Sequence, residues 1–287
     1  MSADGLAQEF ERFRPRLHAI ARRILGSPFA ADDAVQETWL RLDRAAAGDI
    51  DNLGAWLTTV VSRVCIDLIR RESARREEPA LDDGAAPDDP PDARAVREED
   101  LALALDVVLD ELSPVERLAF VLHDVFGLPF DEIAPIVERT SVNARRLASR
   151  ARARIRAVDV TRVRRSRRQA VDAFLAAARE GDFGRLLQLL DPDVELRADE
   201  AAVALAAGGA QHGAPLLDGR VRGADAVARA FAGRAELAAG ADVAQLPAAV
   251  YAPDGSVLAA YVVRFAGGRI AGLDVIAEPA ALADLLA

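Results

Sequence analysis

A helix followed by a tight turn and an arginine-rich helix constrains this 287-residue chain more than any other feature. The stretch from Ser113 to Arg156 opens with a capping-box pattern, because Ser113 is followed by Pro114 and, three positions after the serine, by Glu116. Apolar residues then recur at helical spacing as far as Gly127, which predicts the end of this first helix.

Two further helices are predicted behind that glycine. A short helix is expected over residues 130–137, a tight turn over 138–140, and a longer helix behind the cap Thr140. A helix fits the DNA major groove and arginine meets both phosphates and guanine edges, so the last helix is predicted to recognise duplex DNA. The candidate contact residues on it are Asn143, Arg145, Arg146, Ser149 and Arg150.

The charge distribution supports this prediction. Residues 139–168 hold twelve arginines against one acidic residue, Asp159, a net charge of +11 on a chain whose total is −10. A basic block on an acidic protein is the electrostatic footprint of a nucleic-acid-binding surface. For the arginines between positions 162 and 168, a solvated helix face is an alternative interpretation.

Composition excludes several other classes of protein. Hydrophobic residues make up 51% of the chain and charged residues 29%, which suits packed cores in two or three domains. The single cysteine, Cys65, excludes a disulfide and a cysteine-rich zinc site, and it is expected in a core. Three scattered histidines give no obvious metal site, and no cofactor is expected. Without a signal peptide or a membrane-length apolar run, the chain is expected in the cytoplasm.

Three amphipathic helices are predicted before residue 77. The first covers about residues 8–26, and Pro15 is expected to interrupt or kink it. The second, about 30–46, has a polar side that either binds a partner or is ordinary helix solvation. The third, about 55–76, ends in arginines. Together they predict a helical bundle.

Residues 77–100 are predicted to be an acidic linker. They contain four prolines and ten acidic residues against two arginines, so little of this stretch can form a core. The linker either keeps its neighbours apart, which is our default interpretation, or competes weakly with phosphate for their arginines. Helices are expected to resume at Leu101.

The chain after residue 168 mixes helices with strands. Helices are expected at 169–179, 183–190 and 224–237, with residues 191–193 ending the second of them. Strand-like runs occur at 194–198, 248–252, 257–265 and 269–276. The turns between the last runs suit hairpins, so this order predicts an α+β domain with a curved antiparallel sheet. Residues 201–214 are too rich in small side chains to assign.

These modules, in this order, resemble bacterial RNA polymerase sigma factors of the extracytoplasmic-function (ECF) family. D-D-A-V-Q-E-T-W-L-R-L, residues 32–42, resembles the polymerase-clamp-binding helix of sigma region 2, and residues 54–71 resemble the helix that engages the −10 promoter element. Residues 112–134 with R-R-L-A-S-R-A-R-A-R resemble region 4, which reads the −35 element. The tail, from F-L-A-A-A-R-E-G-D-F to G-L-D-V-I-A-E-P, resembles a SnoaL-like domain of the cone-shaped nuclear transport factor 2-like fold.

The resemblance implies a multidomain fold. Two all-α sigma modules, the region 2 helical bundle and the region 4 helix-turn-helix, would be followed by an α+β SnoaL-like cone domain. The expected bounds are 8–76 for region 2, 77–100 for the linker, 101–158 for region 4 and 166–287 for the SnoaL-like domain. The implied function is that of a non-enzymatic factor that binds the clamp and flap regions of core RNA polymerase and directs promoter-specific transcription initiation.

The resemblance also implies roles for particular residues. The polymerase-binding residues would be Asp33, Gln36, Glu37 and Arg41. The residues 143–150 named above would contact the −35 element, and contacts with the −10 element would come from Asn52, Arg63 and Arg70. Trp56 could stack on a flipped base, although a core position is the other interpretation.

Three roles stay open for the tail. In SnoaL-like cyclases an acidic group and a histidine do acid–base work, and the candidates here are Asp199, His212, Asp218 and Asp274. The tail could instead bind a small-molecule ligand, or, as we prefer, contact the sigma modules within the chain and modulate their activity. For the whole chain, a helix-turn-helix regulator that does not engage polymerase and an enzyme with a DNA-binding appendage are the competing classes. A repressor has no use for a clamp-binding helix, which argues against the first.

Overall fold

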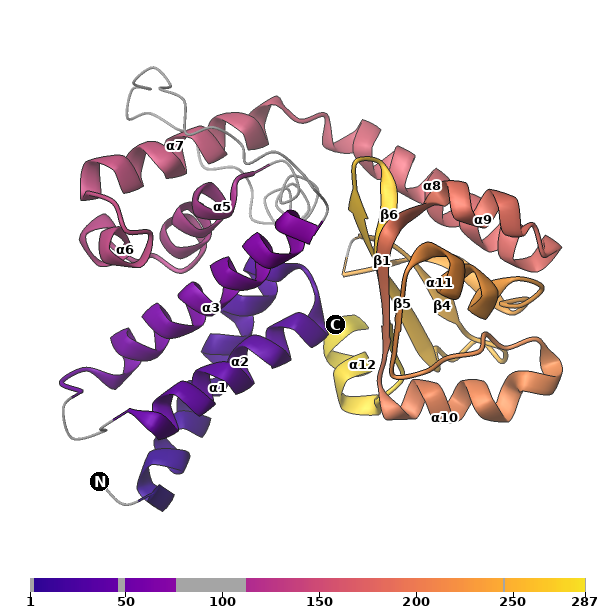
Figure 1. Cartoon of the computed structure of the whole chain (residues 1–287), viewed down its shortest axis with the longest axis horizontal. Coiled ribbons are helices and arrows are strands. Elements are labelled where there is room, and N and C mark those ends of the chain that lie inside the picture. The colour runs from indigo at the N-terminus through magenta and orange to yellow at the C-terminus, as the bar shows by residue number, and fades with distance from the viewer. Residues whose placement is uncertain (1–2, 46–49, 76–111, 245, 287) are drawn as a thin grey trace. The chain divides into compact units, whose positions relative to one another are not determined.

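The computed structural model describes residues 3–45, 50–75, 112–244 and 246–286 (Figure 1). Contacts between Cα atoms divide the chain into two compact units, Met1–Val158 and Asp159–Ala287. The expected linker and the helix expected from Leu101 to residue 111 lie outside the described residues. No helix in the described ranges is both long enough and apolar enough to cross a bilayer.

The N-terminal unit begins with three mutually packed helices, α1 (Ala3–Leu25), α2 (Pro28–Arg44) and α3 (Leu53–Arg75). Cys65 of α3 is buried, as predicted, and burial raises the pKa of its thiol. Helix α1 runs through Pro15 without interruption. One lost backbone hydrogen bond is outweighed by burial of the apolar side of α1, including Leu17 and Ile20, against its neighbours.

The rest of this unit is a helix-turn-helix. Its elements are α5 (Pro114–Phe120), a π-helical turn η3 (Val121–Val125), α6 (Phe130–Ile136) and α7 (Ser141–Ala157). Both predicted caps are confirmed. Ser113 and Glu116 make both hydrogen bonds of the capping box, and the Thr140 hydroxyl accepts from the backbone N–H of Asn143. The π-helical turn was not predicted.

The C-terminal unit is an α+β domain with one six-stranded sheet. Its helices are α8 (Val160–Glu180), α9 (Phe183–Leu189), α10 (Glu200–Gly209), the short 3-10 turn η4 (Ala210–His212), α11 (Ala224–Phe231) and α12 (Pro279–Leu286). Its strands are β1 (Leu190–Ala198), β2 (Arg220–Arg222), β3 (Ala238–Val243), β4 (Leu246–Tyr251), β5 (Ala259–Ala266) and β6 (Arg269–Ile276). The strand order is β2-β1-β6-β5-β4-β3.

The sheet is mixed, which corrects the prediction of an antiparallel one. Strands β3 to β6 form an antiparallel meander, but β1 pairs with β6 in parallel. The prediction that residues 191–193 end a helix is wrong, because they belong to β1, where a proline near the strand start is tolerated. The predicted helix 224–237 stops at Phe231, shortly before Gly233 at φ +71°. Residue 237, where the predicted helix was expected to end, directly precedes β3.

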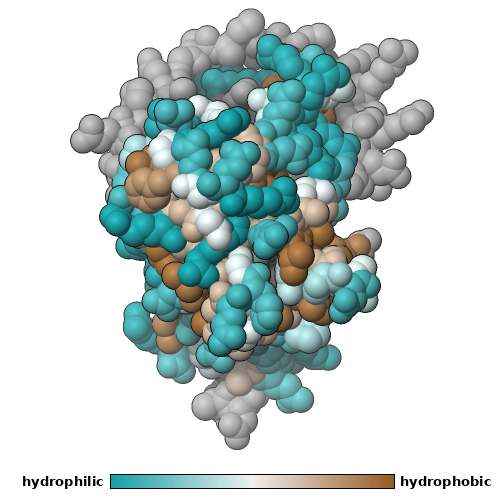
Figure 2. Space-filling view, turned by 90° about the vertical axis from the view of Figure 1, so that its right-hand side faces the viewer, coloured by the Kyte–Doolittle hydropathy of each residue, from teal (hydrophilic) through white to brown (hydrophobic). Residues whose placement is uncertain are grey.

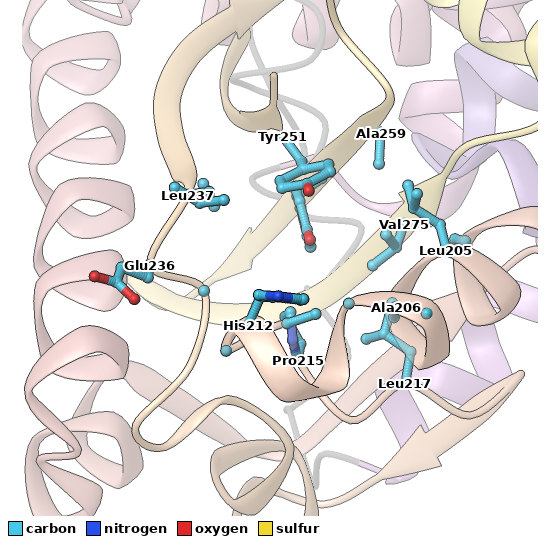
Figure 3. A pocket seen from close by; sticks show the side chains of 18 of the residues that line it. Leu205, Ala206, His212, Pro215, Leu217, Glu236, Leu237, Tyr251, Ala259 and Val275 are labelled. Atoms are coloured by element: carbon cyan, nitrogen blue, oxygen red, sulfur yellow. The ribbon is translucent and has the colours of Figure 1, made fainter. Parts of the chain in front are cut away.

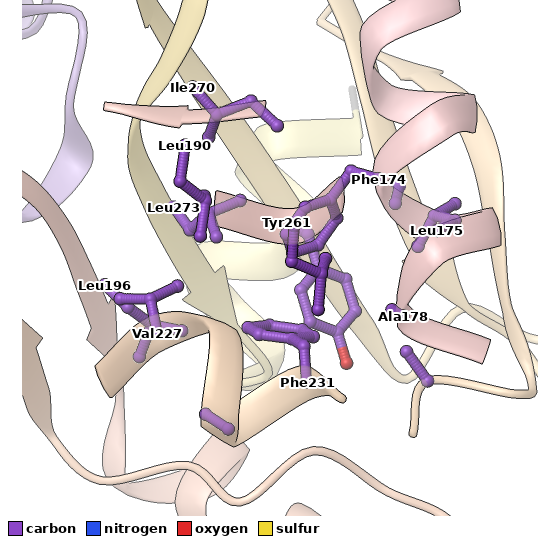
Figure 4. Close-up of a cluster of buried hydrophobic side chains, with 14 of the residues drawn as sticks. Phe174, Leu175, Ala178, Leu190, Leu196, Val227, Phe231, Tyr261, Ile270 and Leu273 are labelled. Atoms are coloured by element: carbon purple, nitrogen blue, oxygen red, sulfur yellow. The ribbon is translucent and has the colours of Figure 1, made fainter. Parts of the chain in front are cut away.

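Helices α8, α9 and α11 pack on one face of this sheet, and the hydrophobic core lies between them and the strands (Figures 1 and 4). Phe231 of α11 lies at its centre, with its ring centroid 5.1 Å from that of Phe174 on α8 and 6.3 Å from that of Tyr261 on β5. Figure 2 shows hydrophobic patches that interrupt an otherwise hydrophilic surface. Among the described residues of this unit, the exposed large hydrophobic side chains are Leu216, Leu237, Leu258 and Leu286.

Candidate nucleic-acid interface and polymerase-binding face

Helix α7 exposes polar side chains in its first two turns. Asn143, Arg145 and Arg146 are exposed, and Ser149 is half-buried. The opposite side, with Ala144 and other small or aliphatic residues, packs against α5 and α6. Sequence reasoning missed the neighbouring Val142, which is 60% exposed at the start of the helix. Valine is an apolar residue, and residue type alone predicts that it is buried rather than exposed.

The buried carboxylate of Glu116 holds α7 against α5. Its Oε1 lies 3.2 Å from Arg150 Nε, and its Oε2 lies 2.9 Å from Arg154 Nη1. Oε2 also accepts the backbone N–H of Ser113, 3.0 Å away, in the capping box. One carboxylate therefore caps α5 and fixes the recognition helix. Arg150, which we predicted to contact DNA, lies inside this network with 18% of its side chain exposed.

A second acid–arginine pair also fixes α7. Arg152 Nη1 donates to Asp124 Oδ1 across 3.1 Å, and Asp124 belongs to the π-helical turn. Burial raises the pKa of Asp124, although the charges of Arg152 and His123 and the hydrogen bond from Arg152 oppose the rise. Three arginines of α7 thus hold the helix in position rather than extend from it.

An aromatic stack supports Arg145. Its guanidinium carbon lies 5.4 Å from the ring centroid of Phe130, within the range of a cation–π attraction. The imidazole of His123 stacks on the same ring with centroids 3.9 Å apart, and its Nδ1 lies 2.9 Å from Leu128 O. The stack joins the π-helical turn, α6 and α7, so the exposed Arg145 is oriented by its neighbours.

Arginines of α8 make contacts inside the C-terminal unit. Arg164 and Arg168 place their Nη2 atoms 2.6 and 2.5 Å from the two carboxylate oxygens of Asp242 on β3. The guanidinium of Arg167 lies 5.2 Å from the ring centroid of Phe265. These contacts fasten α8 to the sheet, a role that neither interpretation of the basic block had included.

The expected −10 residues lie at the start and on the outer side of α3. Asn52 is exposed and caps the helix, since its Oδ1 accepts from Ala55 N across 3.0 Å. Arg63 and Arg70 are exposed, and Trp56 is half-buried. Arg63 Nη2 donates to the carbonyl oxygen of Pro135 on α6, 2.9 Å away.

A buried hydrogen bond also links the helix-turn-helix with the three-helix bundle. Arg117 of α5 is 8% exposed, and its Nη1 donates to the carbonyl oxygen of Ile24 on α1 across 3.0 Å. Together with the bond from Arg63, it joins the two helical modules of the N-terminal unit.

The polar side of α2 contains an apolar residue that sequence reasoning did not select. Asp33 and Gln36 are exposed, and Glu37 accepts from Arg41 Nε across 3.0 Å. Leu40, 38% exposed, lies at helical spacing from the first three of these residues. Charged groups around an exposed leucine are suited to binding a protein partner.

The tail does not assemble the acid–base group considered from the sequence. Of the four candidate residues, His212 alone lines the cavity of about 630 Å³ that lies beside α10 (Figure 3). Asp199 caps α10, Asp218 is exposed beside Gly219, and Asp274 is fully buried with Oδ2 3.8 Å from Arg264 Nε. The described residues contain no cluster of three or more His, Cys, Asp and Glu side chains that could hold a metal ion.

Comparison with known proteins decides the family. Residues 10–75 match the model of Sigma-70 region 2, and residues 102–155 match the model of Sigma-70, region 4. The probable ECF RNA polymerase sigma factor SigI of Mycobacterium tuberculosis is 39% identical over 203 residues, which cover 67% of this chain and 69% of SigI. The ECF RNA polymerase sigma factor SigJ of the same species is 38% identical over 236 residues, covering 78% of this chain and 72% of SigJ. The chain belongs to the ECF family of RNA polymerase sigma factors.

This sigma factor binds core RNA polymerase and directs promoter-specific transcription initiation, and it is not an enzyme. The competing classes, a polymerase-independent regulator and a ligand-transforming enzyme, are thereby excluded. The predicted layout, two helical sigma regions followed by an α+β domain, is confirmed. The crystal structure of M. tuberculosis SigJ aligns with 96% of this chain and 97% of its own, at 29% identity and a TM-score of 0.39.

Proposed function

We propose that this sigma factor reads the −35 element with the first two turns of α7. The observation that carries the proposal is the exposure of Arg145 and Arg146 on a helix that the ion pairs with Glu116 and Asp124 hold in place. Arginine can be bidentate to guanine and asparagine to adenine, each worth about 1–3 kcal/mol of discrimination. Asn143, Arg145, Arg146 and Ser149 are the proposed readers, and Arg150 has mainly a positioning role.

Promoter binding by the polymerase complex tests this assignment. With a −35 duplex selected from a random library, Arg146→Ala is expected to weaken binding about 5- to 100-fold, the equivalent of one lost base contact. Arg12→Ala is the control, because it removes the same charge from an exposed side chain on α1. Equal affinities of the two variants across a salt titration would contradict the role of Arg146.

We propose further that Asn52, Arg63 and Arg70 contact the single-stranded −10 element after the two helical modules separate. The two elements lie about 25 base pairs apart, or about 85 Å at 3.4 Å per base pair. The hydrogen bond from Arg63 to Pro135 is 2.9 Å long. A pair of modules joined by this bond cannot reach both elements, so it must open on the promoter.

Energy transfer between two dyes tests the separation. Cysteines introduced for Thr59 on α3 and Glu132 on α6 would carry the dyes, and native Cys65 is buried away from the labelling reagent. Transfer is expected to fall when core polymerase and promoter are added. A transcribing complex that keeps the transfer efficiency of the isolated protein would refute the opening.

We propose that the side of α2 that carries Asp33, Gln36, Glu37 and Arg41 binds the polymerase clamp, with Leu40 as its apolar anchor, and that the helix-turn-helix binds the flap. Leu40→Asp is expected to weaken binding to core polymerase at least tenfold, because it places a charge in a desolvated contact. Leu258→Asp, at a leucine of the tail with 41% exposure against 38% for Leu40, is the matched control. This work would take place in the cytoplasm together with the polymerase.

We propose that the tail modulates this activity through contact with the sigma modules. A truncation tests it best after Val158, because α8 begins at Val160 and a cut after Arg168 would leave part of that helix behind. Run-off transcription from a cognate promoter should differ between the full chain and residues 1–158. Equal transcript yields at matched concentrations would remove the regulatory proposal.

A further inference from the structure

The cavity in the C-terminal unit lies between α10, the 3-10 turn that follows it and the strands of the sheet (Figure 3). Its volume of about 630 Å³ falls within the range of pockets that enclose drug-sized molecules. Its walls are mostly alanine, glycine, leucine and valine, and its polar side chains are Tyr251, Tyr261, His212 and Glu236. Leu237, 51% exposed, lies among the lining residues and adds apolar surface at the opening.

The sequence of α10 explains why protein side chains do not fill this space. The helix reads E-A-A-V-A-L-A-A-G-G, and it approaches β1 and β6 with side chains too small to fill the gap. Ala202 and Ala206 are buried on the cavity side, where larger aliphatic residues would close the core. Larger side chains at these positions would make additional dispersion contacts and raise the free energy of unfolding. The small residues therefore keep the cavity at a cost in stability.

Hydrogen-bonding groups gather at one part of the cavity. Tyr251 on β4 and Tyr261 on β5 are diagonal neighbours on one face of the sheet, because Ala249 pairs with Tyr261 and Tyr251 with Ala259. Tyr261 is 7% exposed, and within the described part of the chain neither phenol hydroxyl nor the His212 ring has a hydrogen-bond partner. Burial, with a smaller effect of Tyr251, raises the pKa of Tyr261 to about 12, so its hydroxyl is a donor at neutral pH. This hydroxyl therefore borders the cavity and can donate to an acceptor that binds there.

The geometry favours binding over catalysis. In Figure 3 the Tyr251 and His212 side chains face the same space, whereas the carboxylate of Glu236 turns away from them. A carboxylate–histidine acid–base pair needs both groups within reach of one reacting atom, and Glu236, the one carboxylate among the lining residues, does not turn toward His212.

We propose that this cavity binds a small, flat, mostly apolar organic molecule that carries an oxygen acceptor, with the acceptor held by the hydroxyls of Tyr251 and Tyr261 and by His212. The apolar part would lie between α10 and the sheet. This site is separate from promoter and polymerase binding, and its test does not depend on them.

Binding of 8-anilinonaphthalene-1-sulfonate, an aromatic probe with acceptor oxygens, tests the proposal on the full chain. Titration should show saturable fluorescence enhancement with one probe per chain. Ala206→Trp fills the cavity from α10 and should lower the probe affinity at least tenfold. Ala207→Trp adds the same side chain at the next position, which is exposed and outside the lining, and should leave the affinity unchanged.

A second substitution separates the polar contact from the volume. Tyr251→Phe keeps the ring and removes the hydroxyl, so it should weaken probe binding about fivefold, the effect of one lost hydrogen bond. This variant decides the question if circular dichroism shows that Ala206→Trp does not fold. Equal affinities for the two tryptophan variants, or an affinity unchanged by Tyr251→Phe, would overturn the proposal, because the probe would then bind another apolar patch.

Discussion

Replacing Glu116 with glutamine removes one buried negative charge while it leaves the side-chain shape nearly unchanged. The carboxylate, with 4% of its side chain exposed, faces Arg150 and Arg154 on α7 and caps α5 through Ser113. Glutamine keeps one acceptor oxygen but presents an amide N–H₂ to a cation. The substitution therefore weakens the attachment of the recognition helix without deleting a cap or opening a cavity.

The expected cost follows from the exposure of the two arginines. Breaking a fully buried ion pair costs about 3–5 kcal/mol, and the pair with Arg150, which keeps 18% of its side chain exposed, is assigned a smaller value of about 2 kcal/mol. Arg154 is 40% exposed, and solvent screening reduces its share to about 0.5 kcal/mol. The sum of about 2.5 kcal/mol corresponds to about a 60-fold shift in the equilibrium for local opening of α7.

Hydrogen exchange followed by mass spectrometry measures this opening directly. Peptides from residues 141–157 should lose protection by about 60-fold in Glu116→Gln, since local opening limits exchange of helix amides. Peptides from β3 and β4 should not change and serve as the reference within each sample. Glu132→Gln, at an exposed acid in the first turn of α6, is the matched substitution. A change in α7 no larger than that of Glu132→Gln would refute the positioning role of Glu116.

The C-terminal unit gives two further predictions. Burial raises the pKa of Glu195, but hydrogen bonds from the two arginines of β2 and the charges of neighbouring arginines outweigh it and lower the pKa below its ordinary value. The stability from Glu195 is therefore present above the unfolded pKa, about 4.3, and is lost as pH falls through the folded pKa. Urea unfolding of wild type and Glu195→Gln should therefore differ at pH 7, and the difference should shrink as the pH is lowered below 4. Gly272→Ala should cost about 1–3 kcal/mol in thermal unfolding, because its Cβ would displace the guanidinium of Arg264, whose Nε lies 3.8 Å from the fully buried carboxylate of Asp274. Gly219→Ala, with open space around it, should be nearly neutral.

Local signals in the sequence predicted the helical modules well. The caps at Ser113 and Thr140 satisfy backbone N–H groups within four residues, so their effect depends little on the rest of the fold. Gly127 takes φ +69° at the turn before α6, a conformation that glycine adopts without strain. Regular apolar spacing then placed α1, α2 and α3 to within a few residues of their ends.

Features that depend on distant residues could not be predicted in this way. The parallel pairing of β1 with β6 joins segments about 75 residues apart, and nothing in either strand specifies its direction. Strand β3 reads A-A-G-A-D-V, whose small residues favour neither helix nor strand, and pairing with β4 decides its structure. A ligand-binding tail was one of three open roles, but the position and lining of the cavity could not be predicted, because they depend on how α10 lies against the sheet.

The same limit applies to the candidate DNA interface, where the charge count overstated the surface available to DNA. At least five of the twelve arginines at 139–168 contact carboxylates of Glu116, Asp124 and Asp242, all outside that block. If every arginine neutralised one phosphate, the slope of log K against log salt would be about −11, at about −0.9 per contact.

Three exposed arginines of α7, at positions 145, 146 and 156, give a slope of about −3 instead. Binding of the −35 duplex by the polymerase complex is titrated with salt for wild type and for Arg146→Ala. The two slopes of log K against log salt should differ by about 0.9, the value of one phosphate contact. A wild-type slope close to −11 would mean that the internal ion pairs break on DNA, and the proposed separation of positioning and reading arginines would then be wrong.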